Sequence, residues 1–207
     1  METQKRKLVI ATSNPGKFNE IMEVMHNVPL RVLSSRELNL DNNVDEDGDT
    51  YEENAVKKAR HYFEQTGFLT LAEDSGIQVD ALAGELGVKT RRWGAGEAAS
   101  DEEWIAYFLE ALKEVPDAKR TARFVCCAAL MDEKGEVKLF KGVTEGRITH
   151  ELLAPIYRGL PISSCFVPDG FDKVYAALGI AEKNKVSHRG KAMHAVKDAL
   201  CRLDLPR

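Results

Sequence analysis

The residues best suited to chemistry stand near the N-terminus, where an apolar run leads into the polar segment Thr12-Ser13-Asn14-Pro15-Gly16-Lys17. A strand end, a short polar loop and a helix start form a phosphate site, because backbone N–H groups and the positive end of the helix dipole point at the anion. Lys17 adds a full charge, and the preceding hydroxyl and amide groups can donate hydrogen bonds. An ordinary helix cap by Ser13 or Asn14 explains the same residues equally well, and the spacing is not that of a Walker loop.

Two adjacent acids, Glu73 and Asp74, follow a short apolar run at 69–72 and precede Ser75 and Gly76. We expect them at the end of a strand, where open α/β sheets bind their ligands. One carboxylate there can hold a divalent metal or activate water, while Ser75 holds a phosphate oxygen. The alternative is that Asp74 only caps a turn at Gly76.

A second source of carboxylates is the acidic segment 41–49, most of which we expect to be a solvated loop. Mg²⁺ needs only one or two carboxylates beside substrate phosphates. Glu46, just before Gly48, is a candidate to share a metal with Asp74, although the sequence does not choose it over Asp45 or Asp47.

Cations cluster at the start of the last predicted helix, in the segment 182–190 that contains Lys183, His188 and Arg189. Positive charge is unfavourable at a helix N-terminus, so an anion or a carbonyl partner would explain it. Arg189 can present a two-pronged fork to a base carbonyl or a phosphate. The alternative is a solvent-exposed basic turn with His188 on the surface.

The elements that must position these residues alternate between helix and strand at first and then form a β-hairpin. Helices are predicted from about Phe18, from the cap Thr50 to Gly67, over 101–115, and over 188–203 with Ser187 as cap. Strands are predicted at 30–33, 122–131 and 137–143, with a turn at 132–135 and a Pro- and Gly-rich loop at 154–170. This pattern predicts an α/β fold with a mixed, twisted sheet in one domain, 1–207. A hairpin-containing lobe at about 116–150 would leave a central cleft.

Composition excludes several other functions. The net charge of −4 gives no reason to expect a nucleic-acid partner, and no apolar run approaches the roughly twenty residues of a membrane helix. The start of the chain has too few apolar residues for a signal-peptide core, so we expect a cytoplasmic protein. The four cysteines lack C-x-x-C spacing, and Cys126 and Cys127, adjacent inside an apolar run, are expected to be reduced, buried thiols.

Four motifs occur in a specific order: T-S-N-P-G-K, then E-x-G-x-T-Y-x-x-N-A-x-x-K-A, then E-D-S-G, and finally S-H-R-G. Nearly the whole chain thereby resembles the inosine triphosphate pyrophosphatase family. The resemblance implies an elongated, two-lobed mixed α/β fold with a nucleotide cleft, and assembly as a homodimer. It also implies Mg²⁺-dependent hydrolysis of aberrant purine nucleoside triphosphates (ITP, dITP and XTP) to the monophosphate and pyrophosphate.

The family's functional residues map onto this sequence through those motifs. The resemblance implies that Thr12 to Lys17 bind the triphosphate, that Glu46 and Asp74 are metal-linked, and that Asp74 is also the general base. It further implies that Ser75 contacts substrate. The resemblance assigns the purine base to Lys183, His188 and Arg189. Two alternatives remain: the same reaction on a different or broader set of triphosphates, and a nucleotide-binding protein with little turnover.

One segment departs from the family pattern. The family carries G-F-G-Y-D-P or G-W-D-P shortly before F-x-P, and its aromatic ring stacks on the base. The matching positions here are Gly159, Leu160, Pro161 and Ile162, without the aromatic ring or the aspartate. Tyr157 or Arg158 would be the nearest substitutes for the stacking surface. Base recognition is therefore expected to differ, while the catalytic residues are present.

Overall fold

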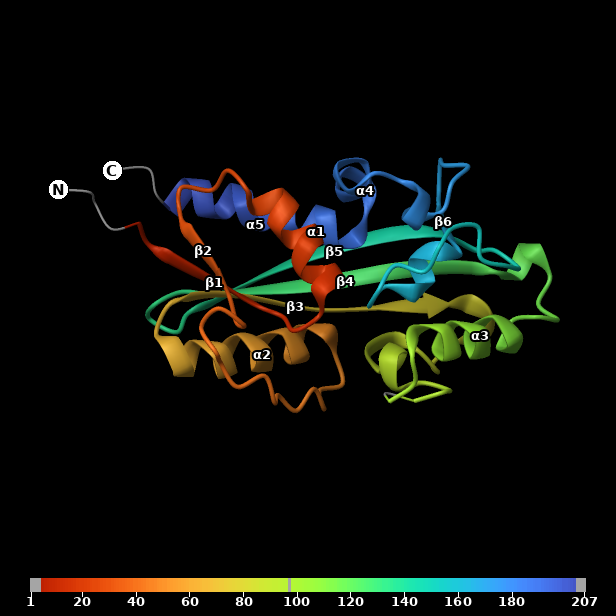
Figure 1. Ribbon diagram of the computed structural model, residues 1–207, viewed down its shortest axis with the longest axis horizontal. Coiled ribbons are helices and arrows are strands. Elements are labelled where there is room, and N and C mark those ends of the chain that lie inside the picture. Colours follow the sequence, from red (N-terminus) through yellow and green to blue (C-terminus); the bar gives the residue numbers. More distant parts are fainter. Residues whose placement is uncertain (1–4, 97, 204–207) are drawn as a thin grey trace.

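The computed structural model describes residues 5–96 and 98–203, and Figure 1 shows an elongated molecule built along one twisted sheet. Within these residues the sheet has six strands in the order β2-β1-β3-β4-β5-β6. The strands are β1 (Lys7–Ala11), β2 (Arg31–Ser34), β3 (Leu69–Val79), β4 (Thr121–Met131), β5 (Val137–Ile148) and β6 (Phe166–Pro168). β1 is parallel to β2 and β3, whereas all later pairs are antiparallel. The predicted mixed α/β sheet is confirmed.

Helices cover both faces of the sheet (Figure 1): α1, α4 and α5 lie on one side, and α2 and α3 lie on the other. Their bounds are α1 (Pro15–Met25), α2 (Tyr51–Thr66), α3 (Asp101–Ala111), α4 (Ile180–Val186) and α5 (His188–Leu203). The predicted ends of α2 are confirmed: Thr50 and Glu53 form a capping box, and Gly67 adopts the left-handed conformation after the last turn. Ser187 caps α5, because its Oγ accepts a hydrogen bond from the Gly190 N–H at 3.0 Å.

Both faces of the sheet carry apolar side chains. Successive side chains of a strand point to opposite faces, so each strand contributes to the packing on both sides. Leu69 and Leu71 of β3 pack in one cluster with residues of α1 and α5. Ala72 faces the other way and packs with Ala55 and Ala59 of α2. The same alternation continues into the polar residues that follow, and it separates Glu73 from Asp74.

The prediction that Glu73 to Gly76 stand at a strand end is wrong, because β3 pairs with β4 from Thr70 opposite Met131 to Val79 opposite Ala122. What does end here is the parallel pairing, because β1 stops at Ala11 opposite Ala72. From Glu73 onward, β3 therefore has no β1 partner on that edge. The polar segment lies where the sheet opens.

Three other boundaries differ from prediction. α3 ends at Ala111 rather than 115, because buried Arg120 donates hydrogen bonds to the carbonyl oxygens of Leu112 and Val115. β5 continues to Ile148, since β4 offers partners along its whole length. The 154–170 loop contains the short helix η4 (Pro161–Ser164) and β6, which pairs with β5.

Candidate active site

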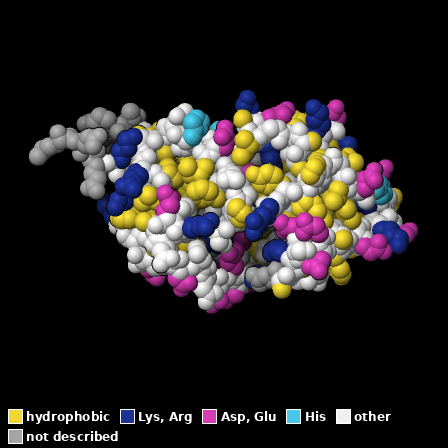
Figure 2. Space-filling model, viewed as in Figure 1, with side chains coloured by type: hydrophobic (Ala, Val, Ile, Leu, Met, Phe, Trp, Pro, Cys, Tyr) yellow, Lys and Arg dark blue, Asp and Glu magenta, His cyan; other side chains and the backbone are white. Residues whose placement is uncertain are grey.

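A cleft of about 710 Å³ opens where β3 leaves β1. In Figure 2, cationic and acidic side chains gather around a hollow near the middle of this face. Ten of the twelve predicted site residues line the cleft: Thr12, Ser13, Asn14, Lys17, Glu46, Asp74, Ser75, Lys183, His188 and Arg189. Pro15 and Gly16 do not line it. The chain thus brings together groups from four distant segments.

The polar loop before α1 is held by Asn14. Its Oδ1 accepts a hydrogen bond from the Lys17 N–H at 3.1 Å, and its Nδ2 donates to the Gly159 carbonyl at 3.0 Å. Asn14 is therefore the helix cap, and its side chain is already occupied on both sides. At Gly16, an added Cβ would stand 2.9 Å from the Arg158 carbonyl oxygen. Glycine at this position therefore allows the 154–170 loop to pack on the first turn of α1.

Glu73 faces the side of the sheet that carries α1 and α5. Its Oε1 lies 2.7 Å from Lys17 Nζ, its Oε2 lies 3.7 Å from Arg189 Nη2, and the Cys126 thiol donates to Oε2 at 3.4 Å. Burial alone would raise the pKa of Glu73, but Lys17 and Arg189 hold it far below its usual range. Glu73 is therefore a permanent anion that fixes two cations.

Asp74 faces the opposite side and is only 5% exposed. Its Oδ2 accepts a hydrogen bond from Asn54 Nδ2 at 3.1 Å, and its Oδ1 accepts one from the Ser75 N–H at 2.8 Å. Burial raises the pKa of this carboxyl, and Lys17 and Lys58 only partly offset the rise. Among the described residues Asp74 forms no direct ion pair, and a carboxylate with a raised pKa in such surroundings is suited to accept a proton.

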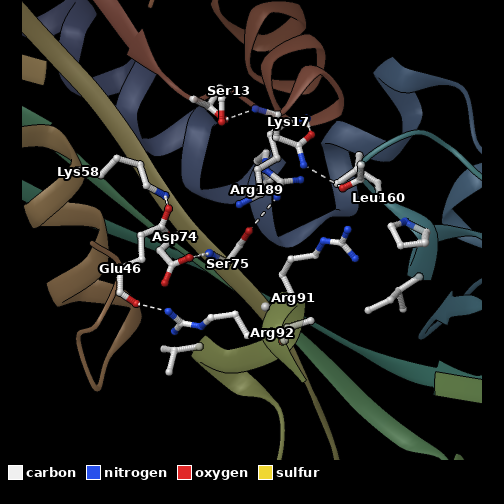
Figure 3. Close-up of a pocket in the computed structure, with 18 of the residues that line it drawn as sticks. Ser13, Lys17, Glu46, Lys58, Asp74, Ser75, Arg91, Arg92, Leu160 and Arg189 are labelled. Carbon is white, nitrogen blue, oxygen red and sulfur yellow. Dashed lines mark hydrogen bonds and ion pairs between the residues drawn. The ribbon is translucent and has the colours of Figure 1, made fainter. Parts of the chain in front are cut away.

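Glu46 reaches the cleft from the segment before α2 (Figure 3). Lys58 Nζ lies 2.9 Å from its Oε1 and donates to the Glu73 carbonyl at 3.1 Å, so one lysine links Glu46 to β3. Asp45 also lines the cleft, whereas Asp47 is exposed and pairs with Lys57. The geometry favours Glu46 over Asp47.

Two cations that the sequence reasoning missed, Arg91 and Arg92, also line the cleft. Arg91 and Arg92 end the short helix η2 (Gly87–Arg92), and both are drawn toward the cleft in Figure 3. Arg92 Nη1 donates to the Glu46 carbonyl at 2.8 Å, while Arg91 donates to the Ala99 carbonyl. Adjacent arginines after a glycine-rich turn were the available sequence signal.

The far end of the cleft is organised by a buried acid of α1, Glu20, which was also missed. Lys183 Nζ lies 2.6 Å from Glu20 Oε1, and Arg189 binds the other oxygen. Arg189 Nη2 also donates to Ser75 Oγ at 2.9 Å. Glu20 and Ser75 thus occupy the two Nη atoms of Arg189, and its Nε has no partner within the described chain. The surface alternative for this cluster is wrong, because Lys183 and Arg189 are buried.

His188 is buried and lies flat on Phe124, with ring centroids 4.5 Å apart and planes 10° from parallel. Burial and the neighbouring Arg189 charge lower its pKa well below 6.5, so its ring is neutral. Its Nδ1 has no hydrogen-bond partner within the described chain. His188 thus joins a stacked aromatic wall rather than the charged cluster.

The residues present fit a divalent metal held mainly by its substrate. Across residues 5–96 and 98–203, no group of three His, Cys, Asp or Glu side chains is placed to hold an ion. Asp74 and Glu46 do line one cleft, and their carboxylate oxygens are hard donors. One or two carboxylates beside phosphate oxygens are the usual protein share of a Mg²⁺ site.

The altered segment 159–162 lies against α3. The Gly159 N–H donates to Asp101 Oδ2 at 2.6 Å, and φ at Gly159 is +77°, a conformation that favours glycine. Ile162 is buried against Trp104 and Phe108 of α3. Neither Tyr157 nor Arg158 is among the described residues that line the cleft, so the suggested substitutes for the aromatic ring are wrong.

Comparison with known proteins places these features in a family context. The profile of the Ham1 family matches residues 8–199. The dITP/XTP pyrophosphatase of Desulforamulus reducens is 40% identical over 197 residues, covering 95% of this chain and 96% of that protein. The enzyme of the same name from Yersinia pestis is 39% identical, with 94% and 98% covered.

Solved structures agree with the sequence matches. The HAM1 protein from Coxiella burnetii superposes with a TM-score of 0.80 at 34% identity, covering 95% of this chain and 99% of that one. The Ham1 protein of Staphylococcus aureus gives 0.79 at 32% identity, with 96% and 100% covered. The likeness therefore extends over the whole fold.

Proposed function

The chain belongs to the Ham1 family, and we propose that its cleft hydrolyses non-standard purine nucleoside triphosphates such as ITP, dITP and XTP to the monophosphate and pyrophosphate. It is a nucleoside triphosphate pyrophosphatase of the hydrolase class. The observation that carries the proposed hydrolytic mechanism is the pair of unlike acids at the opening of the sheet. Glu73 fixes cations for a polyphosphate, and Asp74 remains available for a proton.

The triphosphate is bound by the start of α1 and the cations around it. Lys17 neutralises phosphate charge, and the N–H groups of the first turn of α1 add donors at the positive end of the helix. Phosphoryl transfer depends on positioning and charge neutralisation more than on covalent help. The ion pair with Glu73 keeps the Lys17 ammonium group in position at the cleft.

Asp74 acts as the general base. Its carboxylate accepts a proton from the water that attacks the α-phosphorus, and pyrophosphate leaves. The Asn54 amide and the Ser75 N–H orient the carboxylate, so its remaining lone pairs face the cleft. The raised pKa brings Asp74 nearer to the working pH, which makes it a better proton acceptor than an ordinary aspartate.

The family implies a divalent metal requirement, and we propose Mg²⁺ held by Asp74 and Glu46 together with the substrate. When bound, the ion neutralises charge that develops on the phosphate oxygens. Lys58 links Glu46 to the backbone of β3, so the two carboxylates are held on one wall.

Base selection belongs to the far end of the cleft. Lys183, His188 and Arg189 line that end, and Arg189 Nε and His188 Nδ1 have no hydrogen-bond partner within the described chain. A carbonyl at position 6 of hypoxanthine or xanthine can accept from the N–H groups that remain free there. The amino group of adenine would instead place a donor against donors, which is costly when buried. Gly159 and Ile162 favour a second candidate, the same reaction on a different or broader set of triphosphates.

The test is pyrophosphate release with Mg²⁺ across ITP, dITP, XTP, GTP, ATP and the pyrimidine triphosphates. Preference for ITP, dITP and XTP supports the proposal. Comparable rates with several other bases favour the broader enzyme. No release from any of them would refute both and favour a binding protein.

Three further features belong to the proposal. We propose a homodimer in the cytoplasm without a nucleic-acid partner, on the family resemblance and the acidic net charge of −4. No helix in the described part of the chain is long and apolar enough to cross a membrane. Light scattering at increasing protein concentration tests the dimer, which would be refuted by a constant monomer mass.

A further inference from the structure

Trp104 of α3 lines the cleft beside the altered segment, and none of the assigned roles uses it. Its side chain is 2% exposed, and its indole N–H has no acceptor within residues 5–96 and 98–203. A buried donor without a partner costs free energy, so such groups require an explanation. An acceptor on a ligand in the cleft would supply one.

α3 is fixed against the segment 159–162, which places Trp104 reproducibly. Ser100 and Glu103 form a capping box at the start of α3, and Asp101 holds the Gly159 N–H at 2.6 Å. The indole stacks on Phe108, with centroids 5.4 Å apart and planes 17° from parallel, and it packs with Ile162. Its unpaired N–H is therefore not the result of a loose side chain.

The other tryptophan provides a contrast within the same aromatic cluster. Trp93 lies 6.3 Å from Trp104, centroid to centroid, but its Nε1 donates to Glu85 Oε2 at 3.0 Å. Trp93 is also not among the described residues that line the cleft. Of these two indoles, the one that lines the cleft lacks an acceptor within the described residues.

Two donors flank η4 from different elements. Lys183 of α4 donates to Ser163 Oγ at 3.0 Å, and Trp104 of α3 packs on the neighbouring Ile162. Ile162 itself offers no acceptor through its side chain. This end of the cleft is therefore rich in donors, which matches a base with more than one carbonyl oxygen.

We propose that Trp104 is a specificity-determining residue whose indole N–H donates to one carbonyl oxygen of the base while Lys183 serves the other. The matching substrate is a dioxopurine, so XTP is preferred over ITP. This inference rests on the proposed function. In this proposal, the Trp104 N–H of α3 contributes to base recognition where the segment 159–162 lacks the family's aromatic ring and carboxylate.

The first test is W104F, which replaces the indole with a smaller aromatic ring that has no N–H. We expect the KM for XTP to rise about tenfold with kcat nearly unchanged, because a carbonyl oxygen of the base loses its donor on binding. The ratio of kcat/KM for XTP to that for ITP should fall toward one. W93F is the matched control and should keep the native ratio; an unchanged ratio in W104F would overturn the inference.

The second test needs no turnover and leaves Trp104 in place. The chain has two tryptophans, so W93F makes Trp104 the sole indole fluorophore. Titration with xanthosine monophosphate should change its emission and saturate, while adenosine monophosphate should not. Bound xanthosine monophosphate, shown by calorimetry, without any emission change would contradict the contact.

Failure of this inference is distinguishable from failure of the proposed function. If the native chain releases pyrophosphate from XTP and ITP but W104F keeps the native ratio, only the role of Trp104 is lost. If the native chain hydrolyses no triphosphate, the proposed function is lost, and the emission of W93F still decides whether Trp104 meets the base.

Discussion

The two faces of β3 give two adjacent acids, Glu73 and Asp74, different partners and opposite pKa shifts. Glu73 and Asp74 are both almost fully buried, yet Glu73 meets the cations Lys17 and Arg189, whereas Asp74 meets the Asn54 amide and a backbone N–H. The pKa of Glu73 is consequently lowered and that of Asp74 is raised. Neighbouring carboxylates of one strand thus divide into a structural anion and a proton acceptor.

The helices explain this difference. α1 and α5 begin on the Glu73 face and bring Lys17 and Arg189 with them, and Glu20 adds a second anion for Arg189. α2 covers the Asp74 face and contributes Asn54, a neutral donor, from its first turn. Strand alternation separates the acids, and the packed helices determine which one can titrate.

The largest expected effect comes from removing the proton acceptor. Asp74→Asn keeps the shape of the side chain and can accept one of its two hydrogen bonds, but it cannot take a proton, so kcat should fall about a thousandfold. Nucleotide affinity, measured by calorimetry with a slowly hydrolysed substrate analogue, should change little. Asp47→Asn makes the same change at an exposed acid paired with Lys57, and this control should retain most turnover. Near-native kcat in Asp74→Asn would exclude Asp74 as the base.

The matching change on the other face should act on stability. Glu73→Gln leaves Lys17 and Arg189 buried without their shared anion, which we expect to cost about 3–5 kcal/mol. Urea unfolding monitored by circular dichroism measures it. The control is Glu110→Gln, the same change in an exposed pair with Lys113, which should cost less than about 1 kcal/mol. A cost for Glu73→Gln as small as the control's would disprove the anchoring role.

Asp74→Asn should not share that penalty. The pKa of Asp74 is higher in the folded protein than in the unfolded chain, so the ionised carboxylate lowers the stability of the fold at neutral pH. This loss of stability disappears as the pH falls through the folded pKa and Asp74 becomes protonated. Removing the charge offsets the loss of one accepted hydrogen bond, so the free energy of unfolding should change by less than about 1 kcal/mol. A loss of about 2 kcal/mol or more in the same urea experiment would mean that Asp74 also anchors the fold.

Local patterns were sufficient for much of this site. The capping residues of α2 and the hairpin turn rest on near neighbours in sequence, and the sequence analysis placed them correctly. Residues from each of the four ordered motifs line one cleft. Glu20 was missed because its partners Lys183 and Arg189 lie more than 160 residues away, so only tertiary packing shows why an acid interrupts a buried helix face.

The placement of Glu73 and Asp74 needed the same long-range information. Polar residues after a short apolar run predicted a strand end, yet β4 extends the strand by antiparallel pairing. The helices on each face then supply the partners that make buried acids tolerable. Nothing within 69–76 itself indicates which acid would be paired.

Asn54 gives the most direct test of the claim that Asp74 is the proton acceptor. Its hydrogen bond favours the ionised carboxylate and lowers the pKa of Asp74, so Asn54→Ala should raise that pKa. Ionised Asp74 is the active form, so the fall in activity on the acid side should then begin at higher pH. Asn54 also holds the Gly48 N–H, and Glu53→Ala is therefore the control: it loosens the same loop by releasing the Asp49 and Thr50 N–H groups without touching Asp74.

The decisive measurement is the pH dependence of kcat/KM for pyrophosphate release by the native chain, Asn54→Ala and Glu53→Ala. We predict that the acid limb moves to higher pH in Asn54→Ala and stays in place in Glu53→Ala. An acid limb that is the same in all three proteins would contradict Asp74 as the group that titrates.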